Sequence, residues 1–182
     1  RDPRTALIAF TGSKAVGLDI LQAAGVTPAG QHHIKKVVCE MGGKNAVIVD
    51  GSADLDEAVL AVRQSAFGFS GQKCSACSRV IVVEAAYDTF LRRIVESTRS
   101  LVVGDPRLPG TDVGPVIDRA AQRKIREYIE VGRSEGQVEV ELAVPTGLEA
   151  SVGLPFVGPV VISGIEPHHR LAHEEIFGPV LA

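Results

Sequence analysis

Two cysteines lie in a short stretch whose residue types suit covalent chemistry. Residues 67–79 read FGFSGQKCSACSR, and the small residues around Cys74 and Cys77 let a substrate approach the backbone closely. Lys73 and Arg79 flank the pair, and nearby cations favour a thiolate over a thiol. The pattern predicts a reactive cysteine, and a loop with two incidental thiols is the alternative.

This stretch connects a predicted helix to a predicted strand. The apolar residues of 55–67 recur at helical spacing, and Asp54 with Glu57 form a capping-box-like pair at the start. Residues 80–83 read VIVV, a run typical of a buried strand. The cysteines therefore lie in the loop between the two elements.

A second candidate for chemistry is Glu40, at the end of a predicted strand over 36–40. Two glycines follow it before the next apolar strand, 45–49. Strand ends are where α/β folds commonly place functional groups. The alternative is an exposed, solvated glutamate. Lys44 and Asn45 are interpreted as residues of the turn at the sheet end.

A strand, a glycine and a serine precede a helix near the N-terminus. Residues 6–10 are apolar, Gly12 and Ser13 follow, and 14–24 has helical spacing with Ser13 as a plausible N-cap. Such a junction presents free N–H groups that suit a phosphate. A plain turn and cap is the alternative, because the glycines do not form the G-x-G-x-x-G pattern.

The rest of the chain continues to alternate helices and strands. Helices are predicted from Tyr87 to about Val103 and from Asp118 to Gly132, an edge strand over 137–144, a loop over 145–153 and an interrupted strand over 156–162. Alternation of this kind indicates an α/β fold, a three-layer αβα sandwich with a mostly parallel sheet.

Composition narrows the class of protein. The chain has 182 residues, 45% of them hydrophobic and 23% charged, with a net charge of −3. These values show none of the excess positive charge that is typical of nucleic-acid-binding proteins, and no apolar run reaches the ~20 residues of a membrane span. Three cysteines without a disulfide framework fit a reducing, cytoplasmic compartment. The first residues do not read as a signal peptide, and they open almost directly into a strand, which suggests a segment of a longer protein.

Four stretches resemble the aldehyde dehydrogenase superfamily in their order and spacing. They are FTGS at 10–13, EMGGKN at 40–45, GQKC at 71–74 and EEIFGP at 174–179, and the resemblance covers essentially the whole chain. The versions at 67–79 and at 113–118 (VGPVID) resemble the branch that oxidises glutamate γ-semialdehyde, the open form of 1-pyrroline-5-carboxylate. Cys39 and Met41 stand where the family has leucines beside its glutamate, and these are apolar exchanges.

The resemblance implies covalent catalysis by Cys74. Its thiolate would attack the aldehyde, and the resulting oxyanion would face the main-chain N–H of Cys74. A nicotinamide would take the hydride, which leaves a thioester. Glu40, in the family's role of general base, would activate the water that releases the carboxylate.

The same resemblance implies a set of binding residues. The cofactor is expected to be NAD, with NADP as the open alternative. Gly12 and Ser13 would face its pyrophosphate, Glu175 would hydrogen-bond the nicotinamide ribose and Phe177 would pack beside the ring. Ser75 would help to hold the substrate carboxylate. A cap, a surface glutamate and a core phenylalanine are the plain alternatives for Ser13, Glu175 and Phe177.

By the same resemblance, residues 1–41 are expected to be the end of a cofactor-binding domain and 42–182 a catalytic domain truncated at its C-terminus. Other family parts, including the oxyanion-hole asparagine and the oligomerisation segment, would lie outside this chain. The chain by itself is therefore expected to lack dehydrogenase activity. The parent is expected to be a homo-oligomer, and a fused proline dehydrogenase module is a further option.

Two readings from other classes stay open at this stage. Cys74-x-x-Cys77 is a possible redox motif, and with His169 and His173 it mimics a zinc pattern, although helices and strands fill the long gap. The other reading is a catalytically silent relative that serves as a binding domain. We expect no metal, and we expect Cys77 and Cys39 to be packing residues.

Overall fold

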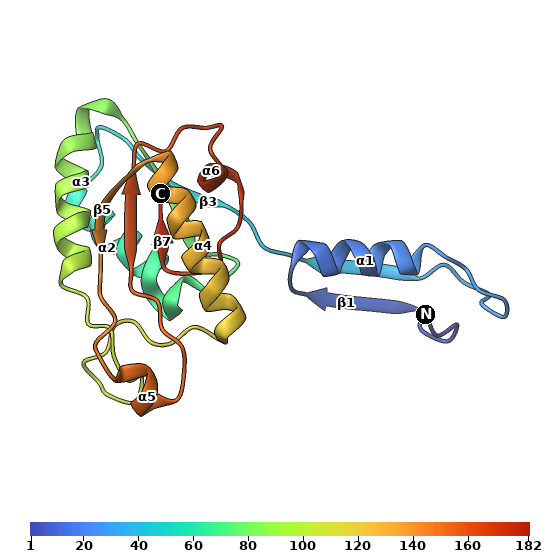
Figure 1. The fold of residues 1–182 in the computed structure, drawn as a ribbon. Coiled ribbons are helices and arrows are strands. Elements are labelled where there is room, and N and C mark those ends of the chain that lie inside the picture. The colour runs from blue at the N-terminus through green and yellow to red at the C-terminus, as the bar shows by residue number, and fades with distance from the viewer. The chain divides into compact units, whose positions relative to one another are not determined.

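The computed structural model describes residues 1–182 and divides them into two compact units, Arg1–Gly43 and Lys44–Ala182. The division falls close to the boundary predicted after Met41. Each unit has its own strands and helices (Figure 1).

The first unit is a β-α-β element. Strands β1 (Leu7–Thr11) and β2 (Lys36–Glu40) are parallel, and helix α1 (Lys14–Ala24) connects them. The Ser13 side chain accepts a hydrogen bond from the Val16 N–H, which confirms the predicted N-cap. Met41 packs against α1 at Gly17, where an added Cβ would lie 2.6 Å from the Met41 sulfur.

The second unit is built on a sheet with one antiparallel edge strand. Strands β3 (Asn45–Val49) and β4 (Cys77–Val82) are parallel, as are β6 (Val160–Ser163) and β7 (Val180–Leu181), whereas β5 (Gln137–Glu141) runs antiparallel to β6. Ala182 joins the two sets, because its O accepts from Val80 N at 2.7 Å and its N donates to Ser78 O at 3.2 Å. The strand order is thus β3-β4-β7-β6-β5, and the predicted, mostly parallel sheet is confirmed.

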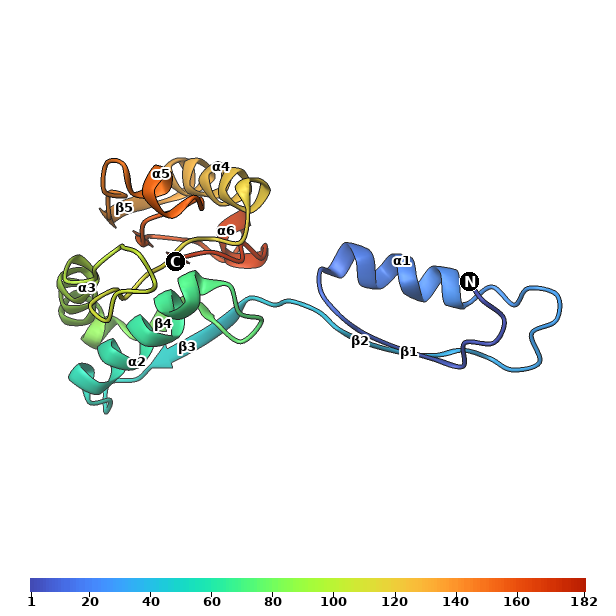
Figure 2. The ribbon, with the colours of Figure 1, turned by 90° about the horizontal axis from the view of Figure 1, so that it is seen from below.

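Helices cover both faces of this sheet. Helices α2 (Leu55–Phe67) and α3 (Glu84–Arg99) lie on one side, and α4 (Arg119–Glu135) and α6 (Arg170–His173) on the other (Figure 2). Alternate residues of β6 show the same division: Val161 packs with α2 and α3, whereas Val160 and Ile162 pack with α4. The predicted three-layer αβα sandwich is confirmed.

Several glycines act differently from the sequence prediction. Helix α4 continues past Gly132, where we expected it to stop, because the missing side chain lets the helix approach Ile162 and Leu171 closely. Glycines flank a short helix, α5 (Leu148–Val152), inside the segment predicted as a loop. At Gly158 an added Cβ would lie 1.8 Å from Leu142 O, so the interrupted strand shortens to 160–163.

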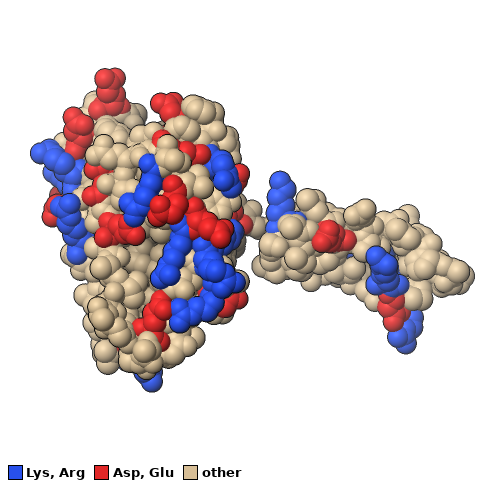
Figure 3. Space-filling view, in the orientation of Figure 1, with Lys and Arg blue, Asp and Glu red and all other residues tan.

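The charged residues form no single-sign field on the face of the second unit seen in Figure 3, where Lys and Arg alternate with Asp and Glu over α4. None of the helices has the length and apolar character needed to span a membrane. No three His, Cys, Asp or Glu side chains are grouped to hold a metal. The alternative zinc set of Cys74, Cys77, His169 and His173 is therefore not assembled.

Candidate active site

Cys74 lies at an exposed turn between the 3₁₀ segment η1 (Gly68–Gly71) and β4. Ala76 N donates to Lys73 O at 3.1 Å, which closes the turn with Cys74 and Ser75 in its two central positions. Both central residues are exposed, and the Cys74 thiol is free. Their main-chain N–H groups have no acceptor within the chain, so they are available to stabilise an anion beside the sulfur.

Cys77 is buried, whereas Cys74 is exposed. Cys77 is only 3% exposed, and burial raises the pKa of its thiol. Its N–H donates to Ser65 Oγ of α2 at 3.0 Å, and its sulfur contacts Arg79 O. Cys77 is a packing residue at the start of β4, as predicted, and the pair lacks the two accessible thiols of a redox motif.

Side chains on either side of Gly71 tie the cysteine loop to residues 114–117. Ser70 Oγ donates to Gly114 O at 2.9 Å, and Gln72 Oε1 accepts from Ile117 N at 2.9 Å. The sequence stretch VGPVID thus adjoins the cysteine loop, although 45 positions separate Gln72 and Ile117.

Gly71 brings the fourth motif next to the cysteine loop. Its φ is +66°, and an added Cβ would lie 2.3 Å from Gly178 O. Gly178 is in turn packed against Ile125 of α4, 2.6 Å from an added Cβ. Only glycine at position 71 permits this close approach of backbone to backbone, whereas the neighbour of Gly178 is the Ile125 side chain.

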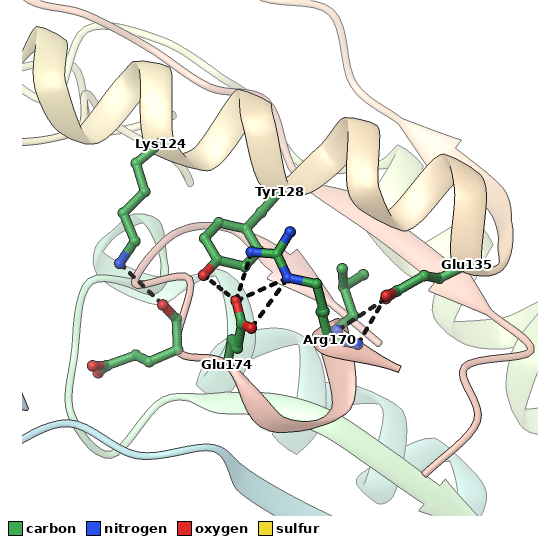
Figure 4. Close-up of polar contacts among 7 residues, drawn as sticks. Lys124, Tyr128, Glu135, Arg170 and Glu174 are labelled. Carbon is green, nitrogen blue, oxygen red and sulfur yellow. Dashed lines mark hydrogen bonds and ion pairs between the residues drawn. The ribbon is translucent and has the colours of Figure 1, made fainter. Parts of the chain in front are cut away.

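A polar network on α4 and α6 holds the segment before Gly178 (Figure 4). The Glu174 carboxylate accepts from Tyr128 Oη at 2.6 Å and from Arg170 Nη2 at 2.8 Å. Arg170, and then Tyr128, lower the pKa of Glu174 to about 2. Burial, and then the Glu174 carboxylate, raise the pKa of Tyr128. Lys124 Nζ donates to Glu175 O at 3.0 Å.

The start of α6 is held by a carboxylate from α4. Glu135 accepts from Arg170 N at 2.8 Å and from Leu171 N at 3.0 Å, which satisfies N–H groups at the helix start (Figure 4). Nothing in the local sequence signals this contact, because Glu135 and Leu171 are 36 positions apart.

Phe177 is not a core residue. It has a left-handed φ of +59° and is 40% exposed, a conformation that is uncommon for a bulky side chain and is found at functional sites. The neighbouring Ile176 is buried among the α4 residues. The segment therefore holds one side chain in the core and presents the next at the surface.

Glu40 and the Gly12–Ser13 junction share one edge of the first unit. Thr11 is opposite Glu40 in the parallel pair, and Gly12 N donates to Glu40 O at 3.0 Å. Glu40 is exposed, and α1 has no acidic residue in its first turn. This edge therefore places a carboxylate and a helix N-terminus close together. The pocket predicted to join Glu40 with Cys74 involves both units and stays a prediction.

Lys44 and Arg79 are partly buried cations, each with a buried nitrogen that lacks a hydrogen-bond partner. Lys44 Nζ has no hydrogen-bond partner, and burial, followed by the charge of Arg79, lowers the pKa of Lys44 to about 8. Glu175 acts in the opposite direction. Arg79, expected to flank the reactive thiol, instead donates to Ala172 O at 3.0 Å.

The comparisons with known proteins cover the whole chain. Residues 1–182 match the model of the aldehyde dehydrogenase family. The 1-pyrroline-5-carboxylate dehydrogenase of Geobacillus thermodenitrificans is 50% identical over 182 residues, which are 99% of this chain and 34% of the relative. The chain thus spans about a third of the length of this curated relative.

Solved structures agree with this match. Proline utilization A (PutA) from Bdellovibrio bacteriovorus is similar with a TM-score of 0.93 and 46% identity, over 99% of this chain and 18% of that one. A 1-pyrroline-5-carboxylate dehydrogenase from Thermus with bound NAD has a TM-score of 0.88 and 44% identity, over 98% and 34% of the two chains. With the family model matched from end to end, the chain belongs to the aldehyde dehydrogenase family.

Proposed function

We propose that this chain supplies the nucleophile and the general base of an NAD-dependent dehydrogenase that oxidises L-glutamate γ-semialdehyde to L-glutamate. The relatives named 1-pyrroline-5-carboxylate dehydrogenase, at about half identity, support this substrate. The observation that carries the proposal is the exposed Cys74 thiol in a turn with two free N–H groups.

The chemistry follows from the residues at this turn. The Cys74 thiolate adds to the aldehyde carbon, and the carbonyl oxygen becomes an oxyanion that the N–H of Cys74 stabilises. The chemistry that bound NAD would supply is that of the hydride acceptor. The carbon then remains as a thioester on Cys74. Glu40 removes a proton from water, which attacks the thioester, so that the carboxylate leaves and the thiol is regenerated.

The residues that would hold NAD have suitable features in their own units. The N-terminus of α1 offers N–H groups and a positive dipole end beside Gly12 and Ser13, without an acidic residue in the first turn. Phe177 presents an aromatic face at the surface of the second unit, next to Glu175. The NAD-bound Thermus relative supports NAD as the cofactor, and NADP is the alternative to be assayed.

The proposal extends to the organisation of the protein. Residues 1–41 are assigned to the end of the cofactor-binding domain and 42–182 to the catalytic domain, with Ser75 beside the substrate carboxylate; the division into the units Arg1–Gly43 and Lys44–Ala182 supports this assignment. The likeness to PutA, of which this chain covers 18%, supports a fused proline dehydrogenase module in the parent. A cytoplasmic homo-oligomer is the proposed state of that parent.

The test is kinetic and uses the full-length protein. We expect turnover of glutamate γ-semialdehyde with NAD to exceed that of other aldehydes. Cys74→Ser abolishes NADH formation, because a serine hydroxyl ionises far less readily than a thiol and is a much weaker nucleophile than a thiolate. Glu40→Gln leaves one NADH per site, released in a burst without turnover, because only thioester hydrolysis needs the base.

The 182-residue chain provides the control. Iodoacetamide should label Cys74 well before the buried Cys77, and no dehydrogenase activity is expected without the rest of the parent. Full-length protein that forms no NADH from any aldehyde contradicts the proposal. About one tightly bound zinc per chain would favour the metal-binding alternative instead.

A further inference from the structure

We propose that Asn45 is a positioning residue for the nucleophile: its side-chain amide sets the orientation of the peptide that follows Cys74. The inference rests on the proposed function in taking Cys74 as the reacting group. Sequence analysis gave Asn45 only a role in the sheet-end turn.

The contact is direct and crosses from one strand to the turn before the next. Asn45 Nδ2 donates to Cys74 O at 2.6 Å and also lies 3.4 Å from Ala76 O. Asn45 is the first residue of β3 and pairs with Cys77, the first residue of β4. The side-chain amide of Asn45 thus contacts the turn that precedes the first residue of β4.

The backbone of Asn45 is itself held in place by an irregularity of the sheet. Asn45 pairs with Cys77 whereas Ala46 pairs with Arg79, so Ser78 is the extra residue of a bulge. Ser78 Oγ donates to Asn45 O at 3.2 Å. Bulges beside functional sites re-aim side chains. Here the backbone register shift, which Ser78→Ala retains, orients Asn45 towards Cys74.

The geometry of the peptide links this contact to the chemistry. Cys74 C=O and Ser75 N–H belong to one peptide, and the chain has no cis peptide bond. In a planar trans peptide these two groups point in opposite directions. Because Asn45 holds the carbonyl, the N–H of Ser75 is directed away from Asn45, where it has no acceptor. Asn45 thereby keeps a second N–H free to face an anion at the nucleophile.

The residue type suits this task. A primary amide offers two N–H donors, which matches the two carbonyls of Cys74 and Ala76. An ionised aspartate has the same shape but only acceptors, so it would repel both carbonyls. Asn45→Asp and Asn45→Ala therefore remove the same contact by different means.

The matched control is Ser78→Ala. It removes a hydrogen bond from the same bulge, to the backbone of Asn45, and leaves the amide of Asn45 intact. A purely structural role predicts that the Asn45 and Ser78 variants change stability and chemistry in parallel. A positioning role predicts that only the Asn45 variants change the chemistry.

The experiment measures the pre-steady-state burst of NADH in the full-length dehydrogenase, together with urea unfolding of each variant. We expect Asn45→Ala and Asn45→Asp to slow the burst about 10- to 100-fold, less than the ~10²–10³ of losing an oxyanion donor outright. The KM for NAD should stay unchanged, and Ser78→Ala should stay within about twofold of the wild-type burst rate. Asn45 variants that keep the wild-type burst rate, or a Ser78→Ala burst as slow as theirs, overturn the inference.

A second measurement separates this inference from the proposed function. The rate of Cys74 alkylation by iodoacetamide is measured in the folded 182-residue chain and divided by the rate in urea. We expect this ratio to fall severalfold in Asn45→Ala and to persist in Ser78→Ala. A protein without any NADH burst refutes the proposed function, whereas an unchanged alkylation ratio in Asn45→Ala refutes the role of Asn45.

Discussion

Gly71 offers the sharpest test of how the cysteine loop is held, through the substitution Gly71→Ala. Its φ of +66° is a left-handed conformation, and an added Cβ would lie 2.3 Å from Gly178 O and 2.9 Å from Ala66 O. Ordinary contact begins at 3.4 Å, so the loop and Gly178 must separate by 3.4 − 2.3 = 1.1 Å. Both neighbours are backbone atoms, which cannot yield by a rotamer change.

Two contributions determine the expected loss of stability. The left-handed conformation disfavours alanine by about 1–2 kcal/mol, of which about 0.4–1 kcal/mol is offset by the stiffer unfolded chain. Forcing the backbone atoms apart adds about 1–3 kcal/mol, as in overpacked cores. We therefore expect Gly71→Ala to lower the free energy of unfolding by about 2–4 kcal/mol, measured by urea titration of the 182-residue chain.

Gly147→Ala is the matched control, because Gly147 has a φ of +81° and nothing within 4 Å of an added Cβ. The free energy of unfolding of Gly147→Ala should fall only by the cost of the left-handed conformation, about 1 kcal/mol. In the full-length dehydrogenase, a shift of about 1 Å in the Cys74 loop should lower the rate of NADH formation about 10²-fold, whereas Gly147→Ala should not. Equal losses of stability in the two variants, with unchanged NADH formation in Gly71→Ala, would refute this account of the loop.

Four further substitutions test other parts of the second unit. Folding lowers the pKa of Lys44 from 10.5 to about 8. Between these two pH values the folded state binds fewer protons than the unfolded state, so the stability of the wild type rises with pH. At pH 7, Lys44→Met should therefore raise the free energy of unfolding by about 1–3 kcal/mol, and this gain should vanish near pH 10.5. Arg170 lowers the pKa of Glu174 to about 2, so the contribution of ionised Glu174 to the free energy of unfolding is present above pH 4.5 and is lost as pH falls towards 2. Urea titrations between pH 6 and 3 should therefore show a smaller loss of stability in Glu174→Gln than in the wild type. Gly158→Ala places a Cβ 1.8 Å from a backbone oxygen and should prevent folding as judged by circular dichroism. Gly132→Ala places a Cβ 2.4 Å from the buried end of the Ile162 side chain, so it should lower the free energy of unfolding by about 1–3 kcal/mol, offset in part by about 1 kcal/mol of helix propensity.

Local sequence signals were sufficient to predict most of the helices and strands. Ser13 and Asp54 cap the helices that their spacing predicted, and the apolar run at 45–49 is a strand. Gly132 shows where such signals fail. A glycine near a helix end indicates a stop, but here the helix continues because Ile162 and Leu171 occupy the space of its absent side chain. Those partners are remote in sequence, so no window around Gly132 contains the information.

At the cysteine site, too, local sequence predicted some properties, whereas others depend on contacts between residues far apart in the chain. The order of the four motifs was enough to identify the family, and the residue types around Cys74 predicted a reactive thiol. The contacts that hold the thiol were not evident, because Asn45 lies 29 positions from Cys74 and Ser70 lies 44 from Gly114. The bulge at Ser78 has no local signature either, since it exists only relative to β3.

The sequence by itself determined the α/β class, the succession of helices and strands and the family, and it predicted Cys74 as the nucleophile, because each depends on residue types and short-range spacing. Only the tertiary structure decided which of two nearby cysteines is exposed, which amide contacts the Cys74 carbonyl and why Gly71 must lack a side chain. These properties arise where segments far apart along the chain come into contact, and the free energy of such contacts depends on distances that spacing in the sequence does not encode.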